Sequence, residues 1–248
     1  GFKEVWVDEF APHFRRLGPE YKTIHLVRDP RAIVASNFVS NHRYPFIFLV
    51  RQWRKLASLA ILSNATSNNS LLVFYENLIQ SPIETQQRIY DFLGVSDIEV
   101  KSSFNNLRDG ALKPWQQNSS HLHTKGMATE EKSGIDLEAI DRWKNALPQS
   151  VITEIERLCE FEMRYLGYSL SQPSEIKPEI NLEGEFWKTR PEVAKWLIPF
   201  VENITPKLVC QEVARLKIMS QNINADDNLK RFLALDPDVY DFLTNFPR

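Results

Sequence analysis

The chain has 248 residues, of which 43% are hydrophobic and 25% are charged, and its formal net charge is −2 at neutral pH. This is the composition of an ordinary globular protein, long enough for one large domain or for a domain with an extension. Without a basic excess, neither nucleic acid nor an anionic membrane is expected as the main partner, and no apolar run is long enough to span a bilayer.

The beginning of the chain predicts a strand, a helix and a second strand. Residues 2–7 have the pattern of a short strand, DEFAPHFRRL has that of a helix ended by Gly18, and residues 22–27 (KTIHLV) have that of a second strand. Because GFKEVWV lacks a methionine and already resembles a strand, we expect the chain to begin inside a domain, with part of any site upstream.

The next elements are helices and one further strand. Helices are expected from Pro30 to about Ser40 and over residues 45–62, and a strand is expected over residues 71–76 (LLVFYE). The continuous apolar run of this strand indicates burial on both faces, as in a parallel sheet.

The helix after this strand has signals at both ends. Ser81 and Glu84 form a capping-box pattern, Pro82 suits the first helical position, and Gly94 is a typical helix end. Strands that alternate with helices predict a parallel sheet with right-handed crossovers. In such sheets ligands bind beyond the carboxyl ends of the strands.

The stretch IHLVRDPRAIVAS places charged residues directly after the second predicted strand. Arg28 then lies at the carboxyl end of the strand, Asp29 can cap the next helix, and Pro30 suits its first position, so the positive helix end faces the crevice. Ser36 is seven residues after Asp29, nearly two turns, and lies on the same helix face. A guanidinium and a hydroxyl in one pocket can receive a phosphate. An alternative of equal weight is that Arg28 forms an ion pair with Asp29 or a surface carboxylate. Ser36 is then only a small helix residue.

Three segments, in this order, resemble sulfotransferases that use 3′-phosphoadenosine 5′-phosphosulfate (PAPS), above all the carbohydrate, tyrosylprotein and bacterial types. They are YKTIHLVRDPRAIVAS, LLVFYENLIQSPIETQQRIYDFLGV and LEAIDRWKNALPQSVITEIERLCEFEMRYLGY, and the likeness covers about residues 1–168. The resemblance implies an α/β fold with a P-loop-like parallel sheet flanked by helices. It also implies transfer of a sulfuryl group from PAPS, as co-substrate, to a hydroxyl acceptor such as a carbohydrate, without a metal.

The resemblance further implies roles for individual residues. Arg28 and Ser36 match the pair that holds the 3′-phosphate of the nucleotide, and Tyr75 matches a strand-end tyrosine that lines the nucleotide site. Arg142 lies where relatives carry a basic residue near the phosphates. Lys3 matches a lysine at the oxygen that bridges sulfate and nucleotide, where a cation stabilises the charge that builds on the leaving oxygen. The alternatives are a packing role for Tyr75, a solvated helix charge for Arg142 and an exposed strand position for Lys3.

Some features of the resembled family are not visible. No stretch looks like the P-loop-like turn that binds the 5′-phosphosulfate, so this turn is expected upstream, and the chain alone is expected to be inactive. No catalytic base can be assigned. The resemblance implies either a histidine two residues after the lysine, where this chain has Val5, or an acidic residue upstream, and Glu4 is more typical of a surface ion pair. A P-loop-type kinase and a non-catalytic nucleotide-binding relative are the alternative functions.

After Tyr168 the resemblance ends, and a linker with prolines leads into several short amphipathic helices. The predicted organisation is therefore a sulfotransferase domain over residues 1–170 and a mostly helical extension over residues 171–248. The extension can be a lid, a contact in a homo-oligomer or a small domain. Cys159 falls on an apolar helical stripe and is expected as a reduced core thiol.

Overall fold

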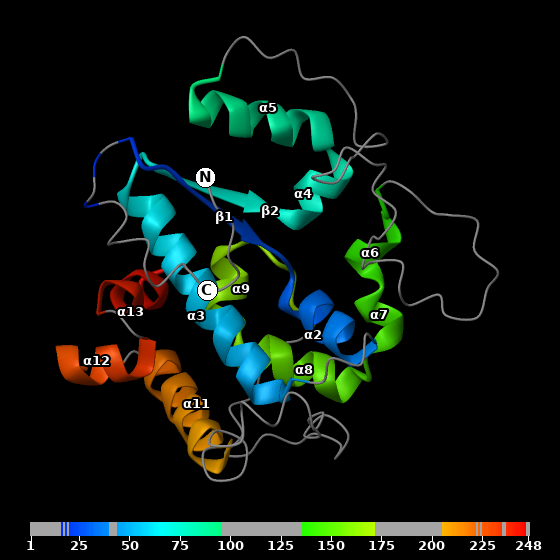
Figure 1. Cartoon of the computed structure of the whole chain (residues 1–248). Coiled ribbons are helices and arrows are strands. Elements are labelled where there is room, and N and C mark those ends of the chain that lie inside the picture. Colours follow the sequence, from blue (N-terminus) through cyan, green and yellow to red (C-terminus); the bar gives the residue numbers. More distant parts are fainter. Residues whose placement is uncertain are drawn as a thin grey trace.

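The computed structural model describes residues 16, 18, 20–39, 44–95, 135–171, 205–221, 223, 225–234 and 237–246 (Figure 1). Its elements, in chain order, are β1 (Thr23–Val27), α2 (Pro30–Val39), α3 (Phe46–Thr66), β2 (Ser70–Phe74), α4 (Tyr75–Gln80), α5 (Pro82–Leu93), α6 (Glu138–Asp141), α7 (Trp143–Ala146), α8 (Gln149–Leu158), α9 (Glu160–Tyr165), α11 (Thr205–Ser220), α12 (Asp227–Ala234) and α13 (Pro237–Thr244). The predicted α/β class is confirmed. None of these helices is both long and apolar enough to cross a bilayer.

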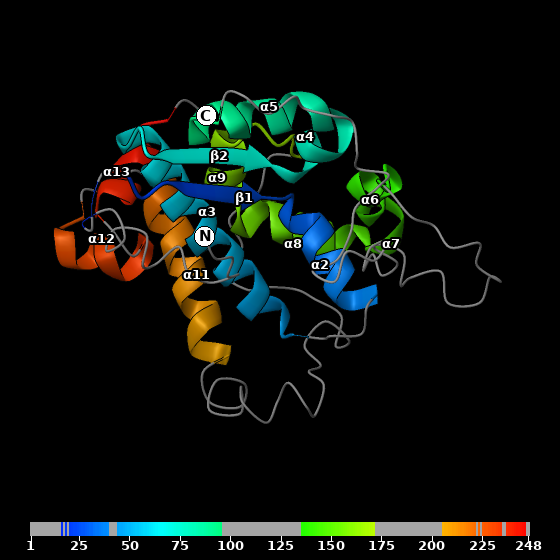
Figure 2. The same ribbon diagram turned by 45° about the horizontal axis from the view of Figure 1, so that its top comes forward.

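The strands β1 and β2 pair in parallel, with Thr23 opposite Ser70 and Val27 opposite Phe74. Parallel neighbours need a long crossover, and α2 with α3 supplies it. The helices α3 and α5 lie on opposite sides of β2 (Figure 2), which explains why Val73 is buried with its strand neighbours. The parallel pairing and the buried apolar strand are as predicted, whereas a P-loop-like arrangement of the whole sheet stays a prediction.

The strand predicted over residues 71–76 is shorter at its end than expected. Pairing stops at Phe74, and Tyr75 begins the helix α4. The reason lies in the neighbouring strand: β1 ends at Val27 and the chain turns into α2 at Pro30, so β2 has no paired backbone beyond Phe74. The apolar and aromatic composition of LLVFYE conceals this change from strand to helix.

The helix α5 begins and ends at the predicted residues, but its predicted capping box is wrong. Pro82 is its first residue, and Gly94 closes it with a φ of 76°. The Ser81 side chain makes no capping hydrogen bond. Its backbone N–H instead bonds to the carbonyl of Asn77, because Ser81 also ends α4 and one residue joins two consecutive helices.

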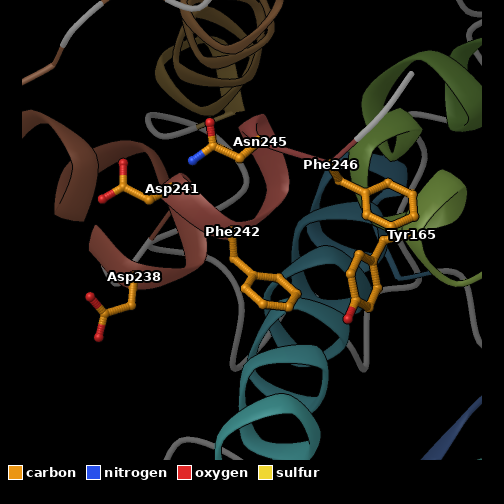
Figure 3. A pocket seen from close by; sticks show the side chains of 6 residues that line it. All are labelled: Tyr165, Asp238, Asp241, Phe242, Asn245 and Phe246. Atoms are coloured by element: carbon orange, nitrogen blue, oxygen red, sulfur yellow. The ribbon is translucent and has the colours of Figure 1, made fainter.

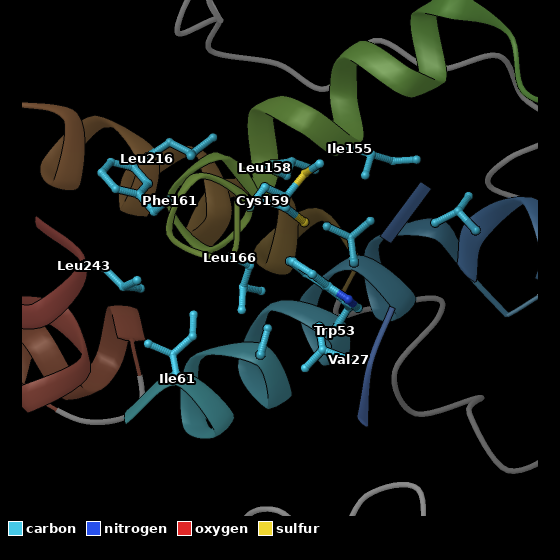
Figure 4. Packing of buried hydrophobic residues seen from close by; sticks show 14 of the residues in the cluster. Val27, Trp53, Ile61, Ile155, Leu158, Cys159, Phe161, Leu166, Leu216 and Leu243 are labelled. Carbon is cyan, nitrogen blue, oxygen red and sulfur yellow. The ribbon is translucent and has the colours of Figure 1, made fainter. Parts of the chain in front are cut away.

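A single hydrophobic core contains helices from both parts of the chain (Figure 4). The helices α3, α8 and α9 contribute side chains such as Ile61, Ile155 and Phe161. From the extension, α11 contributes Leu216 and α13 contributes Leu243 to the same cluster. The described part of the extension is therefore packed against the sulfotransferase-like part, and Cys159 lies in this core as a free, fully buried thiol, as predicted.

Buried ion pairs also join α11 to α3 and α9. Glu212 of α11 accepts a hydrogen bond from Arg54 Nη2 of α3 at 2.9 Å. Arg215 of α11 pairs with Glu162 of α9, whose Oε1 also accepts a bond from Ser58 Oγ at 3.0 Å. Glu162, Glu212 and Arg215 are at most 1% exposed, so these pairs lie in the interior.

Aromatic side chains make a third contact between the two parts, where α13 meets α9 (Figure 3). The ring centroid of Tyr165 lies 5.1 Å from that of Phe242 and 4.7 Å from that of Phe246. An open hollow of about 450 Å³ beside these rings is lined by Tyr165, Asp238, Asp241, Phe242, Asn245 and Phe246.

Candidate functional site

Arg28 lies directly beyond the carboxyl end of β1, where the chain turns into α2. Because Val27 is opposite Phe74, the next residues of the two strands also meet, and the Arg28 guanidinium carbon lies 4.3 Å from the centroid of the Tyr75 ring. Arg28 Nη2 donates to the carbonyl of Ala139 at 2.8 Å. Its Nε is buried and has no hydrogen-bond partner among the described residues. The structure thus brings Arg28 and Tyr75 together, as a cation above an aromatic face.

Asp29 caps the helix α2, as predicted. Its Oδ1 accepts the backbone N–H of Arg31 at 2.8 Å, and its carbonyl accepts the N–H of Ile33 at 3.1 Å. Pro30, which has no N–H to leave unsatisfied, is the first helical residue. The partial positive charge of the α2 N-terminus therefore develops next to Arg28.

Arg31 is a buried cation that the sequence analysis missed. Its guanidinium bonds to Asp29 and donates to Glu156 Oε1 at 2.6 Å, and its central carbon lies 4.0 Å from the centroid of the Trp143 ring. Burial alone would lower the pKa of Arg31, but the bonds and charges of the two carboxylates raise the pKa above its ordinary value. Arg31 is thus fully engaged within the protein and anchors the beginning of α2 to α8.

Glu76, which the sequence analysis placed at the end of the predicted strand 71–76 without a role, supports the turn from the other strand. Its Oε1 accepts the backbone N–H of Asp29 at 2.9 Å, and its Oε2 accepts the hydroxyl of Tyr168 at 3.2 Å. Burial raises the pKa of the Glu76 carboxyl, and the hydrogen bond from Asp29 offsets part of that effect. The signal that could have found it is the strand register, which, if continued two residues beyond the Val27–Phe74 pair, brings Glu76 to Asp29.

The remaining predicted residues are not joined into one site by the described geometry. Ser36 is half-buried in α2 and makes no hydrogen bond among the described residues. Arg142, between α6 and α7, pairs with Asp136 Oδ2 at 2.5 Å. Lys3 lies outside the described residues. The predicted roles of these three side chains stay predictions.

A pocket of about 540 Å³ opens beside Arg28 and Tyr75. Its walls come from β1, α2, α3 and the residues flanking them, including Tyr44, Gln52 and Trp53, and most of the lining is apolar. Trp53 is fixed there by a hydrogen bond from its Nε1 to the carbonyl of Arg28 at 2.8 Å. The volume is in the range typical of small-molecule sites.

Comparison with known proteins identifies the family of the chain. A family described as "Sulfotransferase domain" matches residues 14–167, which is more than half of the chain and includes the whole Arg28 turn, α4 and α9. The chain belongs to the sulfotransferase family. The sequence resemblance is thereby confirmed, and the kinase alternative is not favoured.

Several curated sulfotransferases are similar to the chain. Human carbohydrate sulfotransferase 2 is 24% identical over 225 residues, which cover 71% of this chain and 40% of that protein. A putative protein-tyrosine sulfotransferase of Caenorhabditis elegans is 26% identical over 182 residues, covering 69% of this chain and 66% of that protein. Human carbohydrate sulfotransferase 1 is 27% identical over 197 residues, covering 66% and 43%. The chain thus spans about two fifths of the length of the human relatives it matches. No solved structure matches the chain.

Proposed function

We propose that the protein transfers a sulfuryl group from PAPS to a hydroxyl acceptor, and that Arg28 with Ser36 holds the 3′-phosphate of the nucleotide. The observation that carries this proposal is the state of Arg28. Among the described residues it forms no ion pair, whereas the buried Arg31, Arg54 and Arg215 are each paired with a carboxylate.

A phosphate fits the groups that Arg28 leaves open. A guanidinium has five N–H donors. Arg28 gives one hydrogen bond, to the carbonyl of Ala139, and its Nε donor is buried without a partner. A phosphate oxygen can accept a hydrogen bond from this donor, and the N-terminus of α2 adds a positive partial charge that favours an anion. The Tyr75 ring under the guanidinium keeps its plane fixed for such a contact.

We assign Lys3 to the leaving oxygen and Arg142 to the neighbourhood of the phosphates, within a P-loop-like sheet of sulfotransferase type. A carbohydrate hydroxyl is the first candidate acceptor, because two of the similar relatives are named carbohydrate sulfotransferases. Tyrosine hydroxyls are the second candidate, after the protein-tyrosine relative.

Nucleotide preference tests the proposal. We expect the protein to bind 3′-phosphoadenosine 5′-phosphate (PAP), the product nucleotide, more tightly than AMP in isothermal calorimetry, and to bind ATP with Mg²⁺ weakly. The AMP comparison isolates the 3′-phosphate, because the two nucleotides otherwise share their groups. Equal affinity for PAP and AMP, or a preference for ATP with Mg²⁺, would overturn the proposed function.

A further inference from the structure

We propose that Glu76 is a positioning residue of the nucleotide site, which acts through Arg28 without touching the nucleotide. This inference rests on the proposed function, since it concerns the same 3′-phosphate site. It assigns a role to a carboxylate that lies within the segment LLVFYENLIQSPIETQQRIYDFLGV, for which the resemblance gave a role to Tyr75 alone.

The register of the two strands brings the residues after β1 close to those after β2. Arg28 and Asp29 follow β1, while Tyr75 and Glu76 follow Phe74 of β2. Two successive cross-links continue the pairing beyond the strand ends: the Arg28 guanidinium lies over the Tyr75 ring, and the Asp29 N–H donates to Glu76 Oε1 at 2.9 Å. The second link fixes the peptide between Arg28 and Asp29, and with it the direction in which the Arg28 side chain leaves the backbone.

Glu76 is itself held from a third segment. Its Oε2 accepts the hydroxyl of Tyr168 at 3.2 Å, and the Tyr168 ring meets Phe74 edge-on with ring centroids 6.1 Å apart. Tyr168 follows Gly167, whose φ of 80° ends α9 with the Tyr168 N–H bonded to the carbonyl of Met163 at 2.9 Å. This is a Schellman-type helix end, which gives Tyr168 a defined place.

Glu76 is held by hydrogen bonds and not by an ion pair among the described residues. Both of its oxygens are engaged by hydrogen bonds, and it forms no ion pair within the described part of the chain. The adjacent Asp29 carboxylate is already committed to Arg31. Glutamine would keep the shape and one carbonyl acceptor, whereas alanine removes both acceptors and leaves the Asp29 N–H and the Tyr168 hydroxyl unpaired.

A double-mutant cycle tests whether Glu76 acts through Arg28. In calorimetry we expect Glu76→Ala to weaken PAP binding about tenfold while AMP binding changes less than about twofold, and Glu76→Gln to recover most of the loss. In an Arg28→Ala background, the further loss on Glu76→Ala should vanish. Tyr168→Phe should cost less than Glu76→Ala, because it keeps the ring beside Phe74.

The controls separate positioning from stability and from the proposed function. Glu84→Ala changes an exposed carboxylate of α5 and should leave both affinities unchanged. If Glu76→Ala lowers the melting temperature but leaves the ratio of PAP to AMP affinity intact, or if its effect persists without Arg28, the positioning role is overturned while the proposed function stands. If the native protein does not distinguish PAP from AMP, both fall together.

Discussion

At the scale of single residues, the buried Arg31 and Arg215 and the half-buried Arg28 have different roles because their partners differ. Arg31 is neutralised by Asp29 and Glu156, and Arg215 by Glu162, so their charges hold the fold together. Arg28 has a carbonyl and an aromatic ring instead, neither of which neutralises its charge. A cation kept half-buried without a counter-ion is costly unless an anionic ligand completes it, which is why Arg28 is the residue assigned to the 3′-phosphate.

Replacing Arg28 should therefore affect one phosphate selectively. A charge-assisted hydrogen bond is worth about 1.5–3 kcal/mol, so Arg28→Ala should weaken PAP by about one to two decades and leave AMP nearly unchanged. Arg28→Lys keeps the charge but not the planar fork, so its affinity for PAP should lie between that of the native protein and that of Arg28→Ala. Isothermal calorimetry with both nucleotides measures this, and equal losses for PAP and AMP would remove Arg28 from the 3′-phosphate site.

At the scale of elements, the turn between β1 and α2 is local, whereas the attachment of α11 is not. The turn follows from Asp29 as cap and Pro30 as first helical residue, both visible in the sequence. The attachment of α11 depends on charges from three helices that are far apart along the chain. Arg215 and Glu162 are 53 residues apart, and Arg54 and Glu212 are 158 residues apart.

Breaking this buried attachment should be much more costly than breaking a surface pair. Arg215→Ala leaves Glu162 with a buried charge whose closest partner is lost, and such changes cost about 3–5 kcal/mol of unfolding free energy. Arg164→Ala is the control, because it breaks the partly exposed i, i+4 pair with Glu160 and should cost less than about 1 kcal/mol. Urea unfolding of the two variants gives the comparison, and similar losses would show that the buried pair does not stabilise the attachment.

At the scale of the whole molecule, the sequence predicted what depends on neighbouring residues and missed what depends on distant ones. The parallel strands, the cap of α2 and the helix end at Gly94 each have a local pattern. The roles of Glu76 and Arg31 have no local pattern. The partner of Glu76 depends on the strand register, and Arg31 meets Glu156, which is 125 residues away in the sequence. The roles proposed for Lys3 and Ser36 still depend on the family resemblance.

The packing of the extension predicts how the chain unfolds. Residues of α11 and α13 share one hydrophobic cluster with α3, α8 and α9, and buried ion pairs cross the same contact. We therefore expect the two predicted parts, 1–170 and 171–248, to unfold in one cooperative transition in calorimetry, because neither has a separate core among the described residues.

Truncation gives the second arm of this prediction. A chain that ends at residue 171 loses the side chains of Leu216, Met219 and Leu243 from the cluster and leaves Arg54 without Glu212. Its melting temperature should fall, or it should self-associate through the apolar surface it exposes, as sedimentation would detect. Two well-separated transitions in the intact chain, or an unchanged melting temperature and a monomeric state after truncation, would show that the extension is an independent appendage.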